Sequence, residues 1–321
     1  MILMSDPAFQ GYSFEEQIDT DTASVMVIKN ETGEGSMRCL DTFPGITLSY
    51  NSLKMKSCYQ QVAPMDGFLS LNYCREGCFQ VTLNNGKVYF LGEGDIVLND
   101  PGRSMVIDSL CPTGMFEGFT VIIETKKVVE WMKEHAAWAD VSWLSCEQFR
   151  RLTEPVTIIA NKTEIWHLAE GFYNGSVEKS RSFRIVKVLE LLALISEHIG
   201  ETKPVEYYSL AITKATEAVY HYILQNPAAK VTVGELCSMF GISKTSLQCC
   251  FKSIYGTTPA SFIRDKRIRY AAQRIVSEPG KSIGEIASET GYDNASKFST
   301  AFYTVMNEHP LEYRKRNIRS D

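Results

Sequence analysis

The chain has 321 residues, of which 44% are hydrophobic and 22% charged, the composition of an ordinary globular protein. That length favours two domains, which can bury their cores without disulfides or a structural metal. The nine cysteines are odd in number and form no CxxC motif, which indicates a reduced intracellular protein and not a disulfide framework. The sequence shows no signal peptide and no apolar run of membrane-spanning length, so we expect a cytoplasmic protein with no membrane partner.

The charge is unevenly distributed along the chain, although its net value is only −5. Residues 229–321 carry 14 Lys and Arg against 9 Asp and Glu, whereas residues 1–228 carry 19 against 29. A basic module behind an acidic one is a hint of nucleic-acid contact, although a solvated surface could give the same imbalance.

The front of the chain has the pattern of short β-strands. Apolar and polar residues alternate over 46–50 and 69–73, and an Asn-Gly turn at Gly86 joins two further runs into a hairpin. Several short strands with regular turns over about 20–124 predict a small sandwich or barrel.

Helical periodicity replaces the strand pattern after Thr125. Helices are predicted over 126–138, 163–173 and 182–199. The last of these has an apolar stripe broad enough to need a partner, either the protein's own barrel or a second copy of the chain. Gly200 and Pro204 then mark a linker over 200–211, so the predicted domains are 1–199 and 212–321.

The C-terminal segment contains an internal repeat. One copy runs from Glu235 through Gly241 to Phe262, and the other from Glu285 through Gly291 to Tyr313. The copies are offset by 50 residues up to the glycine and by 51 after it, so the second turn is one residue longer.

Each copy predicts two short helices joined by a tight turn, at about 232–256 and 282–307. In the first copy Gly241 can adopt the left-handed conformation that ends a helix, and Ser243 is a good N-cap for the next one. Apolar residues from Leu247 to Ile254 then share one helical face, which leaves a polar outer face. This is the plan of a helix-turn-helix unit, whose second helix can enter the DNA major groove. The helix over 259–276 would hold the two units rigidly apart.

Residues from about Ala211 to Arg316 resemble the DNA-binding domain of the AraC family of transcription regulators. The resemblance rests on Glu235-Leu-Cys with Gly241-Ile-Ser243, on Arg267-Ile-Arg-Tyr-Ala271-Ala272, and on Ile283-Gly-Glu-Ile286-Ala287 with Gly291, Phe298, Phe302, Pro310 and Tyr313. It implies a promoter-binding activator or repressor, usually a dimer, with an N-terminal effector and dimerisation domain. The β-rich front half is similar to the cupin-like barrel that many members carry.

We therefore expect an α+β protein of two domains, with an N-terminal cupin-like β-barrel and trailing helices before an all-α domain with two helix-turn-helix units. Its expected partners are double-stranded promoter or operator DNA, a second copy of the chain and a small organic effector, with RNA polymerase left open.

Exposed positions on the two second helices are the predicted DNA contacts. They are Lys244, Thr245, Gln248, Cys249, Lys252, Ala295, Ser296, Lys297, Ser299 and Thr300. Thr245 and Gln248 are the candidates for reading bases, and the lysines for binding phosphates. Many family members have Arg or Lys where Cys249, Thr300 and Tyr303 stand here, which argues against strong guanine readout.

A ligand site is predicted on the strands. If the faces that carry Tyr50 and Tyr73 point inward, then Tyr50, Tyr73 and Arg75 line a cavity for a small organic acid or aromatic anion paired with Arg75. The alternative is that both tyrosines belong to the core and that Arg75 caps the mouth of the barrel.

Two other functions stay open. The front half could serve only dimerisation or protein contact, or the chain could be a cupin-type enzyme. The enzyme is disfavoured because all five histidines lie outside the predicted strands, so that we expect no metal site, and no motif for a cofactor is present.

Overall fold

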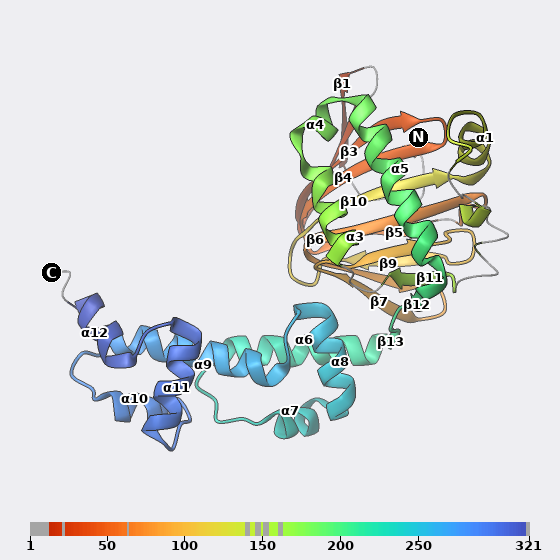
Figure 1. The fold of residues 1–321 in the computed structure, drawn as a ribbon. Coiled ribbons are helices and arrows are strands. Elements are labelled where there is room, and N and C mark those ends of the chain that lie inside the picture. The colour runs from red at the N-terminus through yellow and green to blue at the C-terminus, as the bar shows by residue number, and fades with distance from the viewer. Residues whose placement is uncertain are drawn as a thin grey trace. The chain divides into compact units, whose positions relative to one another are not determined.

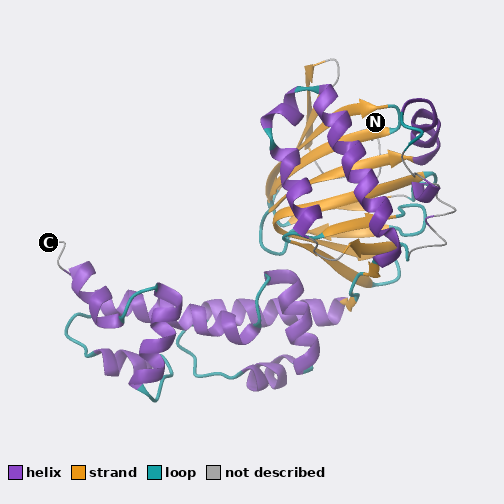
Figure 2. Cartoon of the chain, in the orientation of Figure 1, coloured by secondary structure: helices purple, strands orange, loops and turns teal. Residues whose placement is uncertain are grey.

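The computed structural model describes residues 13–20, 23–62, 64–138, 142–144, 149, 154–159 and 163–318. The chain divides into two compact units, residues 1–209 and 210–321. The first consists of a large antiparallel sheet with helices against it, and the second is helical (Figures 1 and 2). The predicted α+β class, with the all-α part at the C-terminus, is confirmed.

The strands of the first unit pair antiparallel throughout. They are β1 (Ser13–Thr20), β2 (Ala23–Asn30), β3 (Gly33–Phe43), β4 (Ile46–Lys54), β5 (Ser57–Val62), β6 (Phe68–Leu83), β7 (Lys87–Gly92), β8 (Ile96–Asn99), β9 (Val106–Leu110), β10 (Phe116–Glu124), β11 (Val156–Ile159), β12 (Lys203–Pro204) and β13 (Tyr208–Ser209). Their main order is β1-β2-β3-β4-β10-β6-β8-β11-β12.

Strand β6 belongs to two layers. Its first part pairs with β10 and β8, and its second part pairs with β7 and β9. Strand β5 joins β9, and β13 joins β7. The second layer therefore lies over one face of the main sheet.

The predicted barrel is not closed. The pairing path of the described strands begins at β1 and ends at β12, and these two edges do not pair with each other. The expected sandwich or barrel therefore takes the form of an open sheet with a second layer, and the predicted strand-rich front half is confirmed. Closure depends on the number and stagger of the strands, and a local period-two pattern specifies neither.

Helices cover the other face of the main sheet. They are α1 (Thr125–His135), η2 (Ser142–Leu144), α3 (Thr163–Glu170), η3 (Gly171–Tyr173), α4 (Gly175–Lys179), α5 (Arg181–His198) and η4 (Ile199–Glu201). Helix α5 crosses the strands (Figure 1), and Val188, Leu191 and Ile195 share one buried core with Leu48 and the other apolar residues of the central strands. Most of the apolar stripe of α5 thus packs within its own unit.

A smaller part of the α5 stripe stays outside that core. Phe183 and Val186 are 56% and 62% exposed. The stripe therefore divides: its buried side chains pack on the protein's own sheet, as one interpretation predicts, and Phe183 and Val186 are exposed to a partner, as the other requires.

The predicted linker takes part in the first unit. Lys203 and Pro204 pair with β11, and Tyr208 pairs with Val88 of β7. Helix α6 (Leu210–Gln225) begins directly after β13. Gly and Pro mark the break between helices, but backbone groups between them still form strand pairs where a sheet edge is within reach.

The second unit contains two cores joined by one long helix. Its remaining helices are α7 (Val233–Phe240), α8 (Lys244–Tyr255), α9 (Pro259–Ser277), α10 (Ile283–Glu289), α11 (Ala295–Met306) and α12 (Pro310–Ile318). Helix α9 gives Ile263 to the core around Leu247 and Ile268 to the core around Phe298. The two halves are thereby fixed on one helix, as the repeat predicts. Among the described helices, none combines the length and apolar character needed to cross a membrane.

The close packing of the central strands can be tested at Gly118 on β10. A Cβ atom added there would lie 2.1 Å from the backbone oxygen of Tyr73 on the neighbouring strand. We expect Gly118→Ala to lower the free energy of unfolding of the first unit by about 1–3 kcal/mol, the range for overpacked interiors. The control is Gly175→Ala, where no atom lies within 4 Å. Equal unfolding midpoints for the two variants in urea titrations would contradict this packing.

Candidate functional site

The first helix-turn-helix unit is defined by its caps. The Thr232 hydroxyl accepts from the Glu235 backbone N–H while the Glu235 carboxylate accepts from that of Thr232, a capping box that begins α7. Gly241 ends the helix in the left-handed conformation, with φ of 63°. The Ser243 hydroxyl accepts from the Ser246 backbone N–H and begins α8. Both predicted roles, for Gly241 and Ser243, are confirmed.

Helix α8 has one buried and one exposed face. Its apolar side, which includes Leu247 and Phe251, is fully buried. The predicted DNA contacts lie on the other faces: Lys244, Thr245, Gln248 and Lys252 are exposed, and Cys249 is half-buried. The helix therefore presents a polar face with two lysines to solvent.

The second helix-turn-helix unit repeats this construction. Ser282 and Glu285 form a capping box at α10, and the Asn294 side chain accepts from two backbone N–H groups at the start of α11. Phe298 and Phe302 are fully buried. Helix α10 ends at its C-cap Thr290, whose buried hydroxyl donates to the carbonyl of Ile286, and the left-handed Gly291 follows. The additional residue of the turn comes after this glycine, because two residues separate Gly291 from the N-cap Asn294 where one separates Gly241 from the N-cap Ser243.

The predicted contacts on α11 are less available than those on α8. Ala295, Ser296, Lys297 and Thr300 are exposed, whereas Ser299 is half-buried. The Ser299 hydroxyl lies 3.2 Å from Nδ1 of His309, and the Thr300 hydroxyl donates to the Ser296 carbonyl at 3.0 Å. Two of the polar side chains on α11 thus already have hydrogen-bond partners within the protein.

Ion pairing separates the basic residues into two groups. Arg269, Arg274, Lys281 and Arg316 each contact a carboxylate. Within the described part of the chain, no carboxylate pairs with Lys244, Lys252 or Lys297. These three lysines, on the two candidate recognition helices, are therefore available to an anionic partner. The same holds for Lys214, Lys230 and Lys315 elsewhere in this unit, which are exposed and form no carboxylate pair among the described residues.

Arg267 of α9 has a role that the sequence did not reveal. Its Nη2 donates to the carbonyls of Ala229 and Val231 at 2.6 and 2.9 Å, just before α7. Its guanidinium also lies beside Gly291, where an added Cβ atom would be 3.6 Å from the guanidinium carbon. Arg267 therefore links α9 to the segment before α7 and lies beside the turn of the second helix-turn-helix unit. Only its match to the linker helix of the resembled family could have drawn attention to it.

The predicted ligand residues of the first unit lie against helices. The Tyr73 hydroxyl donates to Oε1 of Glu170 at 2.8 Å, and the Tyr50 hydroxyl donates to the Phe172 carbonyl. Burial raises the pKa of Tyr73, as does its bond to Glu170, so the phenol stays neutral. The guanidinium of Arg75 contacts Glu117 and Glu170 at 3.2 and 3.3 Å.

The structure thus brings Tyr50, Tyr73 and Arg75 together, but against residues 170–173 at the interface between sheet and helices. Tyr73 is fully buried, and Arg75 already has two carboxylate partners. Their prediction as a ligand site is corrected, and the argument for an anionic ligand is lost with it. The prediction chose the apolar strand face as the inside of the cavity, whereas the following helices cover that face.

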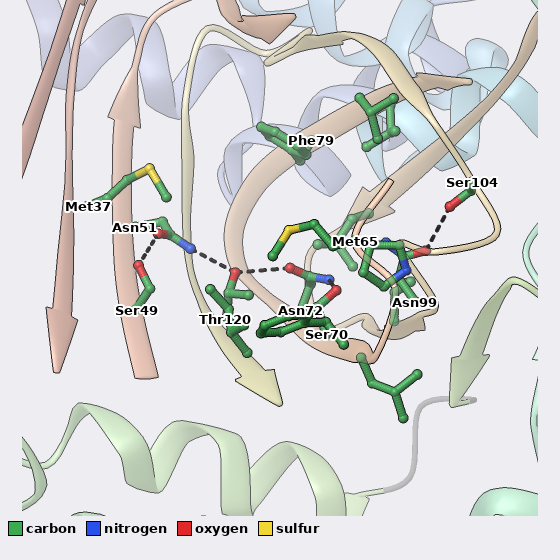
Figure 3. A pocket seen from close by; sticks show the side chains of 18 of the residues that line it. Met37, Ser49, Asn51, Met65, Ser70, Asn72, Phe79, Asn99, Ser104 and Thr120 are labelled. Atoms are coloured by element: carbon green, nitrogen blue, oxygen red, sulfur yellow. Dashed lines mark hydrogen bonds between the residues drawn. The ribbon is translucent and has the colours of Figure 1, made fainter. Parts of the chain in front are cut away.

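A cavity of about 200 Å³ lies on the opposite face of the sheet (Figure 3). The intervening positions of the same strands line it, because neighbouring residues of a strand face opposite sides. Six of its polar residues form a connected row across β3, β4, β10 and β6, which we call the polar row: Cys39, Ser49, Asn51, Thr120, Asn72 and Ser70. Asn99 and Ser104, which hydrogen-bond to each other, also line the cavity.

The polar row is held by hydrogen bonds. Asn51 Nδ2 donates to the Thr120 hydroxyl at 3.0 Å, and that hydroxyl donates to Asn72 Oδ1 at 2.9 Å. At one end the Cys39 thiol lies 3.6 Å from the Ser49 hydroxyl, and burial raises its pKa, so it is a neutral donor. No group of three or more His, Cys, Asp or Glu side chains that could hold a metal occurs in the described ranges.

The second unit matches known proteins. A family model described as a helix-turn-helix domain matches residues 236–316. Over 137 residues the chain is 27% identical to a putative AraC-like transcription regulator of Streptomyces antibioticus, a match that covers 38% of this chain and 45% of that protein. Residues 236–316 form an AraC-type helix-turn-helix domain.

Other similar proteins match the same part of the chain. RclR of Escherichia coli K12, an RCS-specific HTH-type transcriptional activator, is 32% identical over 108 residues, which are 34% of this chain and 38% of RclR. The solved C-terminal domain of AraT, a response regulator from Geobacillus stearothermophilus, is 27% identical and covers 34% of this chain and 86% of that one, with a TM-score of 0.30. The matches span half or less of the length of the first curated relatives.

The left-handed residues that end α8 and α11 in the AraC-type domain can be tested by substitution. Gly256 ends α8 at φ of 67°, and the equivalent position in the repeat, Asn307, ends α11 at φ of 54°. No atom lies within 4 Å of a Cβ placed on Gly256, so only backbone conformation opposes a side chain there.

We therefore expect Gly256→Val to lower the free energy of unfolding of the AraC-type domain by about 1–2 kcal/mol, the cost of a left-handed residue with a Cβ. The control variant Gly256→Asn should cost less, because Asn tolerates this conformation at position 307. Thermal unfolding of both variants measures the difference. Equal losses for Val and Asn would show that the turn is not left-handed in solution.

Proposed function

We propose that this protein is a sequence-specific transcription regulator that binds double-stranded promoter DNA through α8 and α11. The observation that carries the proposal is an AraC-type domain in which both second helices expose a polar face with lysines that no carboxylate of the described residues pairs with. Activation and repression are equally compatible with such a domain.

The exposed residues would divide between two tasks. Lys244, Lys252 and Lys297 would contact phosphates, which position the protein, and Thr245 and Gln248 would read base edges in the major groove. The smaller residues Cys249, Ala295, Ser296, Ser299 and Thr300 would line the groove or its rim. Because α11 offers fewer unengaged polar groups, α8 would contribute more of the sequence preference.

The first unit would make this binding responsive to a small-molecule effector held in its cavity. An effector needs to favour one arrangement of the protein by about 1–3 kcal/mol to change promoter occupancy several-fold or more. In this proposal the protein acts in the cytoplasm as a homodimer, in which the exposed Phe183 and Val186 of α5 meet a second copy, and it contacts RNA polymerase at the promoter.

A catalytic role for the first unit is not part of the proposal. The matched relatives are regulators of transcription, and the polar row of the cavity is composed of neutral side chains. A regulator whose first unit only dimerises is the remaining alternative, and ligand binding distinguishes it.

The first test of DNA binding is its dependence on salt. If lysines on α8 and α11 contact phosphates, each contact releases counterions, and the logarithm of the affinity falls with log salt by about 0.9 per contact. We expect a steep linear decrease when full-length protein is titrated by fluorescence anisotropy onto its own promoter. An affinity that does not change with salt would contradict the proposed interface.

The second test separates base reading from phosphate binding. Gln248→Ala should cost about 1–3 kcal/mol on the preferred site and relax the preference at one base pair. Lys252→Ala should weaken binding to all sequences about equally and reduce the salt slope by about 1. Lys281→Ala is the matched control, because Lys281 already pairs with Glu278 and Glu289. If the Gln248 and Lys252 variants have the same effect on every sequence, the division of roles is wrong.

A further inference from the structure

The cavity of the first unit has walls of opposite character. The polar row forms one wall, on the main sheet. The second part of β6 and strand β7 supply apolar side chains to the cavity. They are Phe79, which Figure 3 labels, and Val81, Tyr89 and Leu91. A mostly apolar site with a few aligned polar groups is typical of pockets that orient a small molecule.

The hydrogen bonds of the polar row run in one direction and leave defined donors unused. The Ser49 hydroxyl donates to Asn51 Oδ1 at 2.8 Å, and the Thr120 hydroxyl donates to Asn72 Oδ1. Asn51 Nδ2 donates to Thr120, and Asn72 Nδ2 donates to the Ser70 hydroxyl at 3.3 Å.

Each carboxamide nitrogen carries two N–H groups, so Asn51 and Asn72 each keep one that these bonds do not use. The nitrogen of Asn51 lies next to the Thr120 hydroxyl, whereas that of Asn72 lies at the Ser70 end of its carboxamide, because Asn72 faces Thr120 with Oδ1. The polar row therefore offers a ligand acceptor two separate N–H donors.

The described lining of the cavity contains no Asp, Glu, Lys, Arg or His. An ionised ligand would lose its hydration there without meeting an opposite charge, which is unfavourable. Arg75, the cation expected from the sequence, lies on the other face of the sheet and is paired with Glu117 and Glu170. The electrostatics therefore select against organic acids and amines alike.

We propose that this cavity binds a small uncharged molecule with a carbonyl or carboxamide group, which accepts a hydrogen bond from an unused N–H of Asn51 or Asn72, and an apolar body, which packs on Phe79 and Val81. This proposal names the chemical class of the effector, and it rests on the proposed function, because the ligand is an effector only if the protein regulates transcription. The binding itself can be measured without DNA.

Three probes with one carbon skeleton and different charge test the class directly. Full-length protein is titrated with phenylacetamide, phenylacetate and phenethylamine, and binding is followed by ligand-observed NMR. We expect phenylacetamide to bind and each ion to bind at least about tenfold more weakly, because only the ions must give up a charge's hydration. Binding of either ion as tight as that of the amide, or no binding of phenylacetamide, would overturn the proposal.

A variant at the centre of the polar row tests the predicted contacts. Thr120→Val removes the hydroxyl that orients both carboxamides with little change of shape, and it should weaken phenylacetamide about tenfold, the scale of one hydrogen bond. Thr82→Val is the matched control: Thr82 is a buried residue of β6 outside the cavity lining, and its hydroxyl has no hydrogen-bond partner among the described residues. Equal affinity of the Thr120 variant and the unmodified protein would place the ligand elsewhere.

Two further measurements keep the outcomes separate. Thermal unfolding midpoints show whether Thr120→Val stays folded, and if it does not, the comparison of the three probes on the unmodified protein decides alone. Promoter binding is measured on the same preparation. Loss of probe binding with intact DNA binding overturns only the inference drawn from the cavity, whereas the reverse overturns only the proposed function.

Discussion

The organisation of the first unit depends on which face of its central strands the helices cover. Strands β4, β10 and β6 have an apolar face, with Leu48, Leu71 and Val121, and helices α3 and α5 bury it completely. Burial of this face is the main favourable term available to the unit. Once it is satisfied, the alternate residues of the same strands must face the other way, where the second layer meets them. The polar row and the cavity are consequences of that choice.

The same constraint explains the cluster around Glu170. Helix α3 brings this carboxylate over the sheet, where Tyr73 donates to it and Arg75 pairs with it. The Arg75 guanidinium also lies over the ring of Tyr173 at 4.2 Å. A charge at the edge of an apolar interface is costly unless it is paired, so these contacts let the helix layer pack on the sheet at this edge.

The second unit achieves order through local signals that agree with its packing. Capping boxes begin α7 and α10, and left-handed residues end α8 and α11. Helix α9 supplies apolar side chains to both cores, and Arg267 adds polar contacts between the halves. Arg269 and Arg274 of α9 pair with nearby carboxylates, whereas the lysines of α8 and α11 form no such pair among the described residues and stay available to an anionic partner.

The sequence by itself determined the elements and the plan of the second unit. The caps at Ser243 and the turn glycine Gly241 act within a few residues, and the buried faces of α8 and α11 follow from helical periodicity, so local information was sufficient. It also determined which residues of α8 would be exposed, since the faces of a helix are fixed by spacing once its buried side is known.

Only the tertiary structure decided what the strands of the first unit enclose. A period-two pattern divides a strand into two faces but does not say which one the helices will cover, and so Tyr50 and Tyr73 were assigned to a cavity instead of to the helix interface. Residues far apart in the chain likewise determine three other features. These are the open edges of the sheet, the carboxylate partners of Arg75 and the hydrogen bonds of Arg267 to the segment before α7. Such contacts depend on strand order and helix placement, which no short stretch of sequence encodes.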